Sequence, residues 1–126
     1  RTCAMQNHTT VVIGASNKPH RYANKAIKML QEYGYHVIPV HPKLENIEGL
    51  VVKHTLESIQ EDVDTLTLYV GPQRIGELIE SIVTLSPARV ILNPGTESEP
   101  LELALLHNDI PFVKDCTLLM LEHGRY

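Results

Sequence analysis

The first apolar run of the chain is followed by a turn that is rich in glycine, small polar residues and cations. This turn reads Gly14-Ala15-Ser16-Asn17-Lys18-Pro19-His20-Arg21. Gly14 allows a sharp turn, and Ser16 or Asn17 can cap a helix that follows. The free N–H groups and the dipole of such a helix start attract anions, and the cations of the turn, with Lys25, add positive charge. The turn predicts a site for the phosphates of a nucleotide-like ligand, the alternative being an ordinary glycine turn with solvated cations.

A second turn, His41-Pro42-Lys43, bears on which nucleotide is bound. NAD sites carry an Asp or Glu at this place, after the second strand, to bind the ribose hydroxyls. The fingerprint G-x-G-x-x-G is not met either, because Ser16 and Pro19 stand at its second and third glycine positions. NAD is therefore disfavoured. Lys43 suits a phosphate attached near the ribose, as in NADP or in coenzyme A with its 3′-phosphate, and an exposed loop lysine is an equal alternative.

Two further turns have residues that let a backbone approach a ligand closely. They are Val70-Gly71-Pro72 and Asn93-Pro94-Gly95, whose glycines and prolines are also ordinary turn residues. The second leads into Thr96-Glu97-Ser98-Glu99, whose carboxylates favour a helix start and repel a bound anion. We therefore expect phosphates at the first turn of the chain and an uncharged part of the ligand at these two turns.

Patterns for catalysis and for metal binding are absent from the sequence. Cys116 is the obvious nucleophile, but its neighbour Asp115 would raise rather than lower the pKa of the thiol, so a structural or slowly exchanging cysteine is favoured. The seven histidines show no recognised ligand spacing with cysteine or carboxylate, and His20 or His41 is a candidate phosphate neighbour instead. There is no G-x-S-x-G elbow, Walker A loop or His/Glu zinc helix. We predict no catalytic residue and no metal site.

Short apolar runs alternate with segments of helical periodicity, and this pattern predicts the elements that position the turns. Strands are expected at 11–13, 35–40, 64–70, 89–92 and 111–113, with a short edge strand at 51–52. Helices are expected at about 19–33, near 56–59, after Pro72 and after Gly95, before an apolar tail at 118–121. This alternation implies a Rossmann-like three-layer α/β sandwich with a parallel sheet of about five strands. Ligands of such sheets lie beyond the carboxyl ends of the strands, where the turns described above fall.

The composition is that of one ordinary folded domain. The chain has 126 residues, of which 43% are hydrophobic and 21% charged, and a net charge of -4, which argues against a membrane span and against nucleic-acid binding. We expect a flexible N-terminus at 1–9, with Met5 as a candidate native start after an added segment, and one domain at 10–126. The two cysteines, Cys3 and Cys116, form no disulfide framework, and RTCAMQNHTT lacks the apolar stretch of a signal peptide, so a cytoplasmic protein is expected.

The order of these turns resembles the small stand-alone CoA-binding domain proteins, which are similar to the N-terminal domain of the succinyl-CoA synthetase alpha subunit. The resemblance covers about Thr10 to Gly124 and rests on GAS-x-x-P-x-R, V-x-P-V-x-P, x-P-G and the Asp-Cys pair near the C-terminus, in this order. It implies that CoA phosphates are held by Gly14, Ala15, Ser16, Asn17, Lys18 and Arg21. It also implies that Pro42 and Lys43 flank the nucleotide end and that Asn93-Pro94-Gly95 lines the path of the pantetheine arm.

The resemblance makes non-catalytic binding of coenzyme A or an acyl-CoA the leading hypothesis. The phosphorylated histidine of the synthetase lies in a second domain that this chain lacks, which argues against ligase chemistry. His41 stands where many relatives have Asn, and Asn93-Pro94 replaces a more usual pair that contains Gln. Cys116 is a candidate for a mixed disulfide with the CoA thiol. The alternatives are an enzyme with an NADP-like cofactor and a protein-interaction module with a vestigial pocket, and a homo-oligomer and a partner subunit both stay open.

Overall fold

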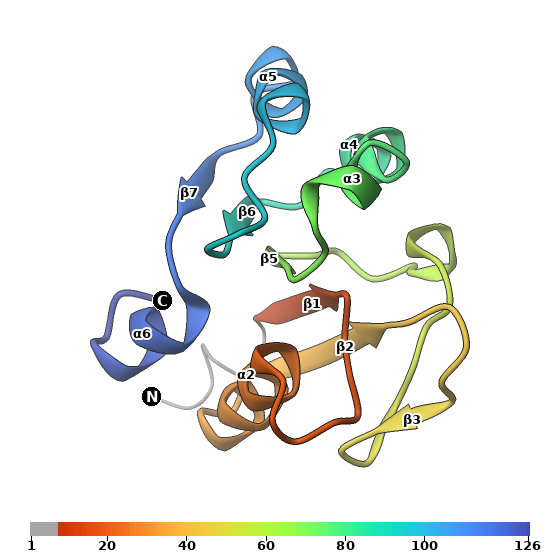
Figure 1. The fold of residues 1–126 in the computed structure, drawn as a ribbon, viewed down its shortest axis with the longest axis vertical. Helices are drawn as coiled ribbons and strands as arrows, with labels where there is room; N and C mark the ends of the chain where they lie inside the picture. The colour runs from red at the N-terminus through yellow and green to blue at the C-terminus, as the bar shows by residue number, and fades with distance from the viewer. Residues whose placement is uncertain (1–7) are drawn as a thin grey trace.

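Five short strands pair in parallel in the computed structural model of the protein, which describes residues 8–126 (Figure 1). They are β1 (Thr9–Ile13), β2 (His36–Val40), β5 (Thr65–Leu68), β6 (Arg89–Leu92) and β7 (Phe112–Lys114). Their order across the sheet is β2-β1-β5-β6-β7, so the chain adds a strand on one side of β1 and then the rest on the other. The predicted parallel sheet of about five strands is confirmed.

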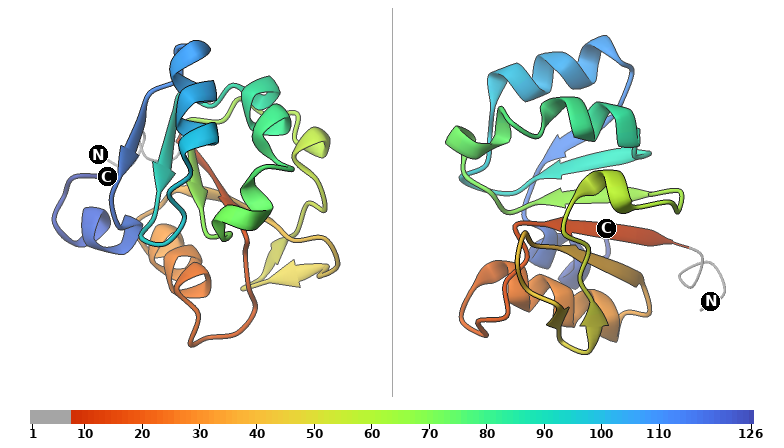
Figure 2. Two further views of the ribbon diagram at one scale, coloured as in Figure 1. Left: turned by 45° about the horizontal axis from the view of Figure 1, so that its top comes forward. Right: turned by 90° about the vertical axis from the view of Figure 1, so that its right-hand side faces the viewer.

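Helices cover both faces of the sheet, which becomes the middle of three layers (Figure 2). One face carries α2 (Tyr22–Glu32) and α6 (Thr117–Glu122). The other carries α3 (Pro72–Ile75), α4 (Ile79–Leu85) and α5 (Glu99–His107). A single turn of 3₁₀ helix, η1 (Leu56–Ser58), packs against α4. This arrangement is the predicted Rossmann-like α/β sandwich.

The central strand β1 is buried on both faces, which explains its continuous apolar run. Val11 and Ile13 belong to the core under α4 and α5, whereas Val12 packs toward α2 with Ile27 and Leu30. Each of these five side chains is at most 2% exposed. Because successive residues of a strand point to opposite faces, apolar residues at consecutive positions let one strand support both cores.

β2 forms one edge of the sheet, and the proline inside it is compatible with that place. Pro39 lies opposite Val12 of β1. Its carbonyl accepts a hydrogen bond from the N–H of Lys53 on the outer side, at 3.0 Å. Because the N–H and C=O positions of one strand residue point the same way, the N–H that proline lacks would also face outward, so no bond to β1 is lost.

A two-stranded hairpin follows β2 where the sequence predicts one short edge strand. β3 (Asn46–Ile47) and β4 (Leu50–Val51) pair antiparallel and form a separate sheet, so the predicted pairing is wrong. Ile47 is 1% exposed because it packs in the core on α2. Glu48 and Gly49, at the turn of the hairpin, have positive φ angles of 52° and 80°.

Three helices differ from their predicted extents. α2 begins later than predicted, because Arg21 keeps an extended backbone with ψ of 143°. The one helix predicted after Pro72 is interrupted at 76–78, where the N–H of Leu78 bonds to the carbonyl of Ile75 (2.8 Å) in a 3₁₀-type turn around Gly76. The apolar tail belongs to α6.

The ends of the description bear on two sequence expectations. β1 already begins at Thr9, inside the segment 1–9 that is predicted to be flexible. Residues 1–7, with Cys3 and Met5, lie outside the described residues. Within residues 8–126, no helix is both long and apolar enough to cross a membrane.

Candidate functional site

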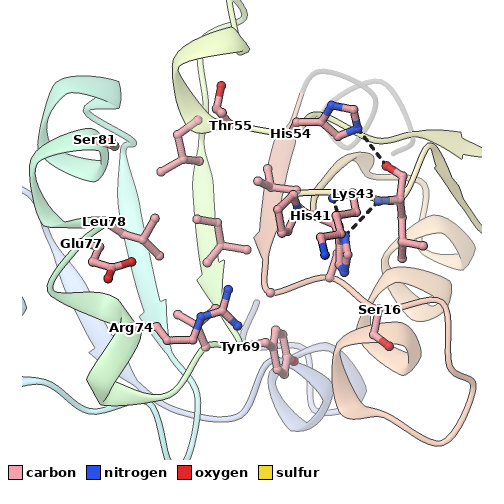
Figure 3. Close-up of a pocket in the computed structure, with 18 of the residues that line it drawn as sticks. Ser16, His41, Lys43, His54, Thr55, Tyr69, Arg74, Glu77, Leu78 and Ser81 are labelled. Atoms are coloured by element: carbon pink, nitrogen blue, oxygen red, sulfur yellow. Dashed lines mark hydrogen bonds between the residues drawn. The ribbon is translucent and has the colours of Figure 1, made fainter.

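A cavity of about 820 Å³ opens at the carboxyl ends of the central strands (Figure 3). It lies where β2 and β5 flank β1 and the strand order changes direction, which is the usual ligand position in open parallel α/β sheets. Its volume falls in the range of about 300–1,000 Å³ that is typical of small-molecule sites. The turns after β1, β2 and β5 all contribute to its lining.

The cavity has two walls that are joined at one end. The first wall is formed by the turn 14–21 and by residues 41–44, and the second by α3 and the start of α4. Residues 54–57 connect them: His54 Nε2 lies 3.2 Å from the carbonyl oxygen of Leu44, and Ser81 donates a hydrogen bond to the Glu57 carboxylate. The joined end is therefore fixed by side-chain hydrogen bonds to both walls.

Gly14 permits the closest approach between two of the lining turns. Its φ is +82°, and a Cβ atom at this position would lie 2.7 Å from the carbonyl oxygen of Tyr69. The N–H of Ala15 donates to the carbonyl of Val40 (3.2 Å), and the N–H of Tyr69 donates to the carbonyl of Ile13 (2.9 Å). Any other residue at Gly14 would be strained and would press against the backbone after β5.

The turn 14–21 has free backbone donors and leads into an uncapped helix, α2. Ser16 Oγ accepts a hydrogen bond from the N–H of Lys18 at 3.1 Å, and Arg21 is the N-cap residue without a capping side-chain bond. The prediction that Ser16 or Asn17 caps this helix is therefore wrong, because the helix begins too far along the chain. Within residues 8–126, the N–H groups of Ser16 and Asn17 have no hydrogen-bond partner. These donors and the uncapped helix start can receive an anion.

Four cationic side chains line the cavity: Lys18, Arg21, Lys43 and Arg74. All four are exposed, and in the described part of the chain none forms a salt bridge with a carboxylate. Figure 3 shows Arg74 near Tyr69, at the end of the cavity where Ser16 lies. This end therefore carries cations that form no ion pair within residues 8–126.

His41 folds its ring back onto its own turn. Its Nδ1 accepts hydrogen bonds from the N–H groups of Lys43 and Leu44, both at 3.0 Å, which requires a neutral ring with its proton on Nε2. Burial lowers the pKa of His41, and the positive charges of Arg74, His54 and Lys43 lower it further. His41 thus shapes the turn that carries Lys43.

The opposite end of the cavity has a different chemistry. Glu57 contributes a carboxylate there and Leu56 contributes apolar surface, while Glu77 and Leu78 lie on the second wall between Arg74 and Ser81 (Figure 3). The hydrogen bond from Ser81 lowers the pKa of Glu57. Because ionised carboxylates repel anions and accept hydrogen bonds, this end suits an uncharged group with N–H or O–H donors rather than a phosphate.

Tyr69 lies in the lining between the two walls (Figure 3). Its hydroxyl is buried and has no hydrogen-bond partner in residues 8–126. Burial raises the pKa of this phenol, so the side chain is neutral at physiological pH. Tyr69 therefore contributes an uncharged surface beside the cationic end.

The turn after β6 is not part of the cavity. Asn93 is 3% exposed, and its amide donates to Thr67 Oγ1 and to the Leu68 carbonyl, both at 2.7 Å. Its Oδ1 accepts from the N–H and the hydroxyl of Thr117, both at 2.9 Å. The amide is therefore fully used in joining three segments, while Pro94 and Gly95 are exposed beyond the lining. Their contact with the pantetheine arm stays a prediction.

α5, which follows this turn, closes its own N-terminus. Ser98 accepts a hydrogen bond from the N–H of Leu101 (3.4 Å), and the N–H of Gly95 donates to Glu97 (3.0 Å). Glu99 and Glu102 add negative charge in the first turn. This helix start has no free donor surface comparable to that of α2.

Cys116 also lies outside the cavity lining. It is the N-cap residue of α6, it is partly buried, and its N–H donates to Asp115 Oδ1 at 2.7 Å. Its predicted mixed disulfide with a ligand thiol stays a prediction. Among residues 8–126, no group of three or more His, Cys, Asp or Glu side chains is placed to hold a metal ion.

Most of the predicted site residues come together, and several others join them. Those in the lining are Gly14, Ala15, Ser16, Asn17, Lys18, Arg21, His41, Pro42, Lys43 and Val70. Gly71 and Pro72 lie next to it as the N-cap and first residue of α3. Sequence reasoning misses Arg74, Glu77 and Ser81, although their spacing of three and four residues is a recognisable signal for one polar helix face.

Comparison with known proteins points in one direction. A family model described as CoA binding domain matches residues 8–122. The crystal structure of an uncharacterised protein is 39% identical, with a TM-score of 0.89, and the match covers 94% of this chain and 98% of that chain. A structure from Thermus thermophilus, cell-free ID.343, is 29% identical, with a TM-score of 0.87, and the match covers 94% of this chain and 90% of that chain.

A curated relative matches over a shorter stretch. The uncharacterised protein YneT of Bacillus subtilis (strain 168) is 25% identical over 72 residues, which is 57% of this chain and 53% of YneT. The match therefore spans about half the length of that relative.

Proposed function

The chain belongs to the CoA binding domain family, and from this premise we propose that it binds coenzyme A or an acyl-CoA in the cavity and catalyses no reaction on it. One observation carries the proposal. The turn 14–21 has free N–H groups at Ser16 and Asn17, ends at the uncapped start of α2, and lines the cavity together with the side chains of Lys18 and Arg21. Coenzyme A supplies a diphosphate that fits such a site.

The other cations of the cavity fit the second anionic group of coenzyme A. Lys43 stands on a turn that His41 holds through two backbone hydrogen bonds. Arg74 adds a guanidinium from the other wall. We assign the diphosphate to the turn 14–21 and the 3′-phosphate to Lys43. Arg74 adds its positive charge to the cavity from the second wall.

Uncharged parts of the ligand fit the end with Glu57. Adenine and the pantetheine amides both carry N–H groups that can donate hydrogen bonds to a carboxylate. Phosphates, in contrast, would be repelled by the negative charge of the carboxylate. Pro94, Gly95 and Cys116 would contact a pantetheine arm that extends beyond the cavity. This extension is part of the proposal.

Several titratable groups of the cavity are already engaged, which supports binding rather than catalysis. His41 uses Nδ1 as an acceptor for backbone N–H groups, and Glu57 accepts from Ser81. Cys116 lies outside the lining. A general base or nucleophile needs a free atom within hydrogen-bond reach of the ligand.

Calorimetry with four ligands separates this proposal from its alternatives. We expect tight binding of coenzyme A, weaker binding of dephospho-CoA because Lys43 loses its partner, and weaker binding still of NADP and NAD. Preference for NADP would support an enzyme with an NADP-like cofactor. No binding of any of the four would support an interaction module with a vestigial pocket and would overturn the proposal.

A double variant tests the turn 14–21 directly. Lys18→Ala with Arg21→Ala should weaken coenzyme A binding at least about tenfold, because charge-assisted contacts to phosphate are lost. The matched control, Lys28→Ala with Lys114→Ala, removes the same net charge away from the cavity lining. Equal affinity of the two double variants would remove the turn from the proposed site.

A further inference from the structure

One buried side chain joins the turn 14–21 to the hairpin β3–β4. Asn24, in the first turn of α2, is 0% exposed. Its Nδ2 donates to the carbonyl oxygen of Ser16 at 2.9 Å and to Oε2 of Glu48 at 3.0 Å. A buried amide that donates both hydrogens to two separate segments holds those segments in a fixed relation.

The orientation of the Asn24 amide follows from its partners. A flipped amide would place Oδ1 against two acceptor oxygens, which cannot donate to it. In the observed orientation, Oδ1 has no partner within residues 8–126. The bonds to Ser16 and Glu48 are therefore formed although they leave a buried acceptor unsatisfied.

The bond to Ser16 sets the direction of the next backbone donor. In a planar trans peptide, the C=O of one residue and the N–H of the next point in opposite directions. Because the carbonyl of Ser16 points toward Asn24, the N–H of Asn17 points away from the contact between α2 and the hairpin. Asn17 lines the cavity, and its N–H has no partner in the described residues.

We propose that Asn24 is a positioning residue: anchored by Glu48, it holds the Ser16–Asn17 peptide so that the N–H of Asn17 faces a phosphate of the ligand. This inference rests on the proposed function. It makes the hairpin β3–β4 part of the site, although neither of its strands lines the cavity. The turn of the hairpin, at Glu48, is the outer support of the anion site.

Four variants test this tether. Asn24→Ala removes the donor, and Glu48→Ala removes its anchor, whereas Glu48→Gln keeps an acceptor oxygen. Gln31→Ala is the matched control, because Gln31 Nε2 donates to the Glu48 carbonyl (3.4 Å) from the same helix without touching the turn 14–21. For each variant, coenzyme A affinity is measured by calorimetry, stability by thermal unfolding, and the Asn17 amide by ¹⁵N–¹H NMR.

Asn24→Ala and Glu48→Ala should each weaken coenzyme A binding about tenfold, the equivalent of one lost hydrogen bond. A fifth variant that combines Asn24→Ala with Glu48→Ala should bind coenzyme A no more weakly than the weaker-binding of the two single variants, because both substitutions break the same linkage. Glu48→Gln and Gln31→Ala should bind within about twofold of the unchanged protein. In Asn24→Ala, the Asn17 amide signal should no longer respond to coenzyme A.

Other results would overturn the tether. Lower thermal stability with unchanged affinity, additive losses in the double variant, or an unchanged Asn17 response would each show a purely structural role. If Asn24→Ala does not fold, the exposed Glu48 variants carry the test. If the unchanged protein binds no coenzyme A, the proposed function fails; the tether then stands only if the ligand-free Asn17 signal shifts in Glu48→Ala and not in Glu48→Gln.

Discussion

Two strand-to-helix turns at the same edge of the sheet have opposite properties. The turn after β1 leads into α2, which has no side-chain cap and no acidic residue in its first turn. The turn after β6 leads into α5, which Ser98 caps and whose first turn holds Glu99 and Glu102. A parallel sheet presents several helix N-termini along one edge, and side-chain chemistry decides which of them stays open to an anion.

The glycines of these two turns share a backbone conformation but have different surroundings. Gly14 and Gly95 both have positive φ, +82° and +89°. A Cβ atom on Gly14 would meet the backbone of Tyr69, whereas one on Gly95 would meet nothing within 4 Å. Gly14 therefore permits a close approach between two turns, whereas Gly95 is surrounded by open space.

The largest expected effect comes from alanine at each glycine. Gly14→Ala should lower the free energy of unfolding by about 2–4 kcal/mol, since a backbone clash adds to the strained φ, and should abolish coenzyme A binding. Gly95→Ala should cost about 1–2 kcal/mol, from φ strain alone, and should weaken coenzyme A binding less than Gly14→Ala does, because a Cβ atom at Gly95 meets no neighbouring atom of the described residues. Urea unfolding and calorimetry measure both, and equal destabilisation by the two variants would contradict the contrast.

A serine in each turn gives an intermediate effect. Ser98→Ala should lower the free energy of unfolding by about 1 kcal/mol, because α5 loses its cap, and should leave coenzyme A affinity unchanged. Ser16→Ala removes the acceptor for the Lys18 N–H, so it should weaken coenzyme A binding about three- to tenfold while stability changes by less than about 1 kcal/mol. The reverse pattern, with Ser98 controlling affinity, would refute the division between the turns.

The smallest effect is a pH dependence at the turn after β2. The pKa of His41 in the folded chain is lower than its ordinary value of 6.5, so the unfolded chain binds a proton more readily. The contribution of His41 to the free energy of unfolding is therefore fully present above pH 6.5 and is lost as the pH falls through the lowered pKa. His41→Asn keeps an acceptor for the backbone N–H groups and should remove this part of the loss. Unfolding free energies from pH 8 down to pH 5 measure it.

The pH dependence measured for the unchanged protein also includes a contribution from His8, because burial lowers the pKa of that residue too. His8 is the same in both proteins, so its contribution cancels in the difference between the two pH curves. Parallel curves would show that His41 does not titrate in the turn.

The fold could be predicted from the sequence because its strands are short and buried. Consecutive apolar residues such as Val11-Val12-Ile13 are typical of a strand that is buried on both faces, where they pack in two cores. Gly14 ends this run at the carboxyl edge of the sheet. The cations of the turn 14–21 were accessible for the same local reason. Nothing beyond neighbouring residues was needed to predict them.

The rest of the site depends on contacts between distant residues. Ile47 packs in the core on α2, and β3 and β4 pair with each other as a hairpin where the sequence predicts one edge strand. The amide of Asn93 is engaged by bonds to Thr67 and Thr117, 26 and 24 residues away, and Asn93 lies outside the cavity lining. Such pairings have no local signature.

The central place of β1 also has a kinetic meaning. Thr10 of β1 lies opposite Thr65 of β5, so this pairing closes a long loop and is a slow part of folding. A ligand held by the turns after both strands can bind only after the pairing has formed. Ligand binding would therefore leave the folding rate unchanged and slow the unfolding rate. The bound protein would stay folded longer before each unfolding event.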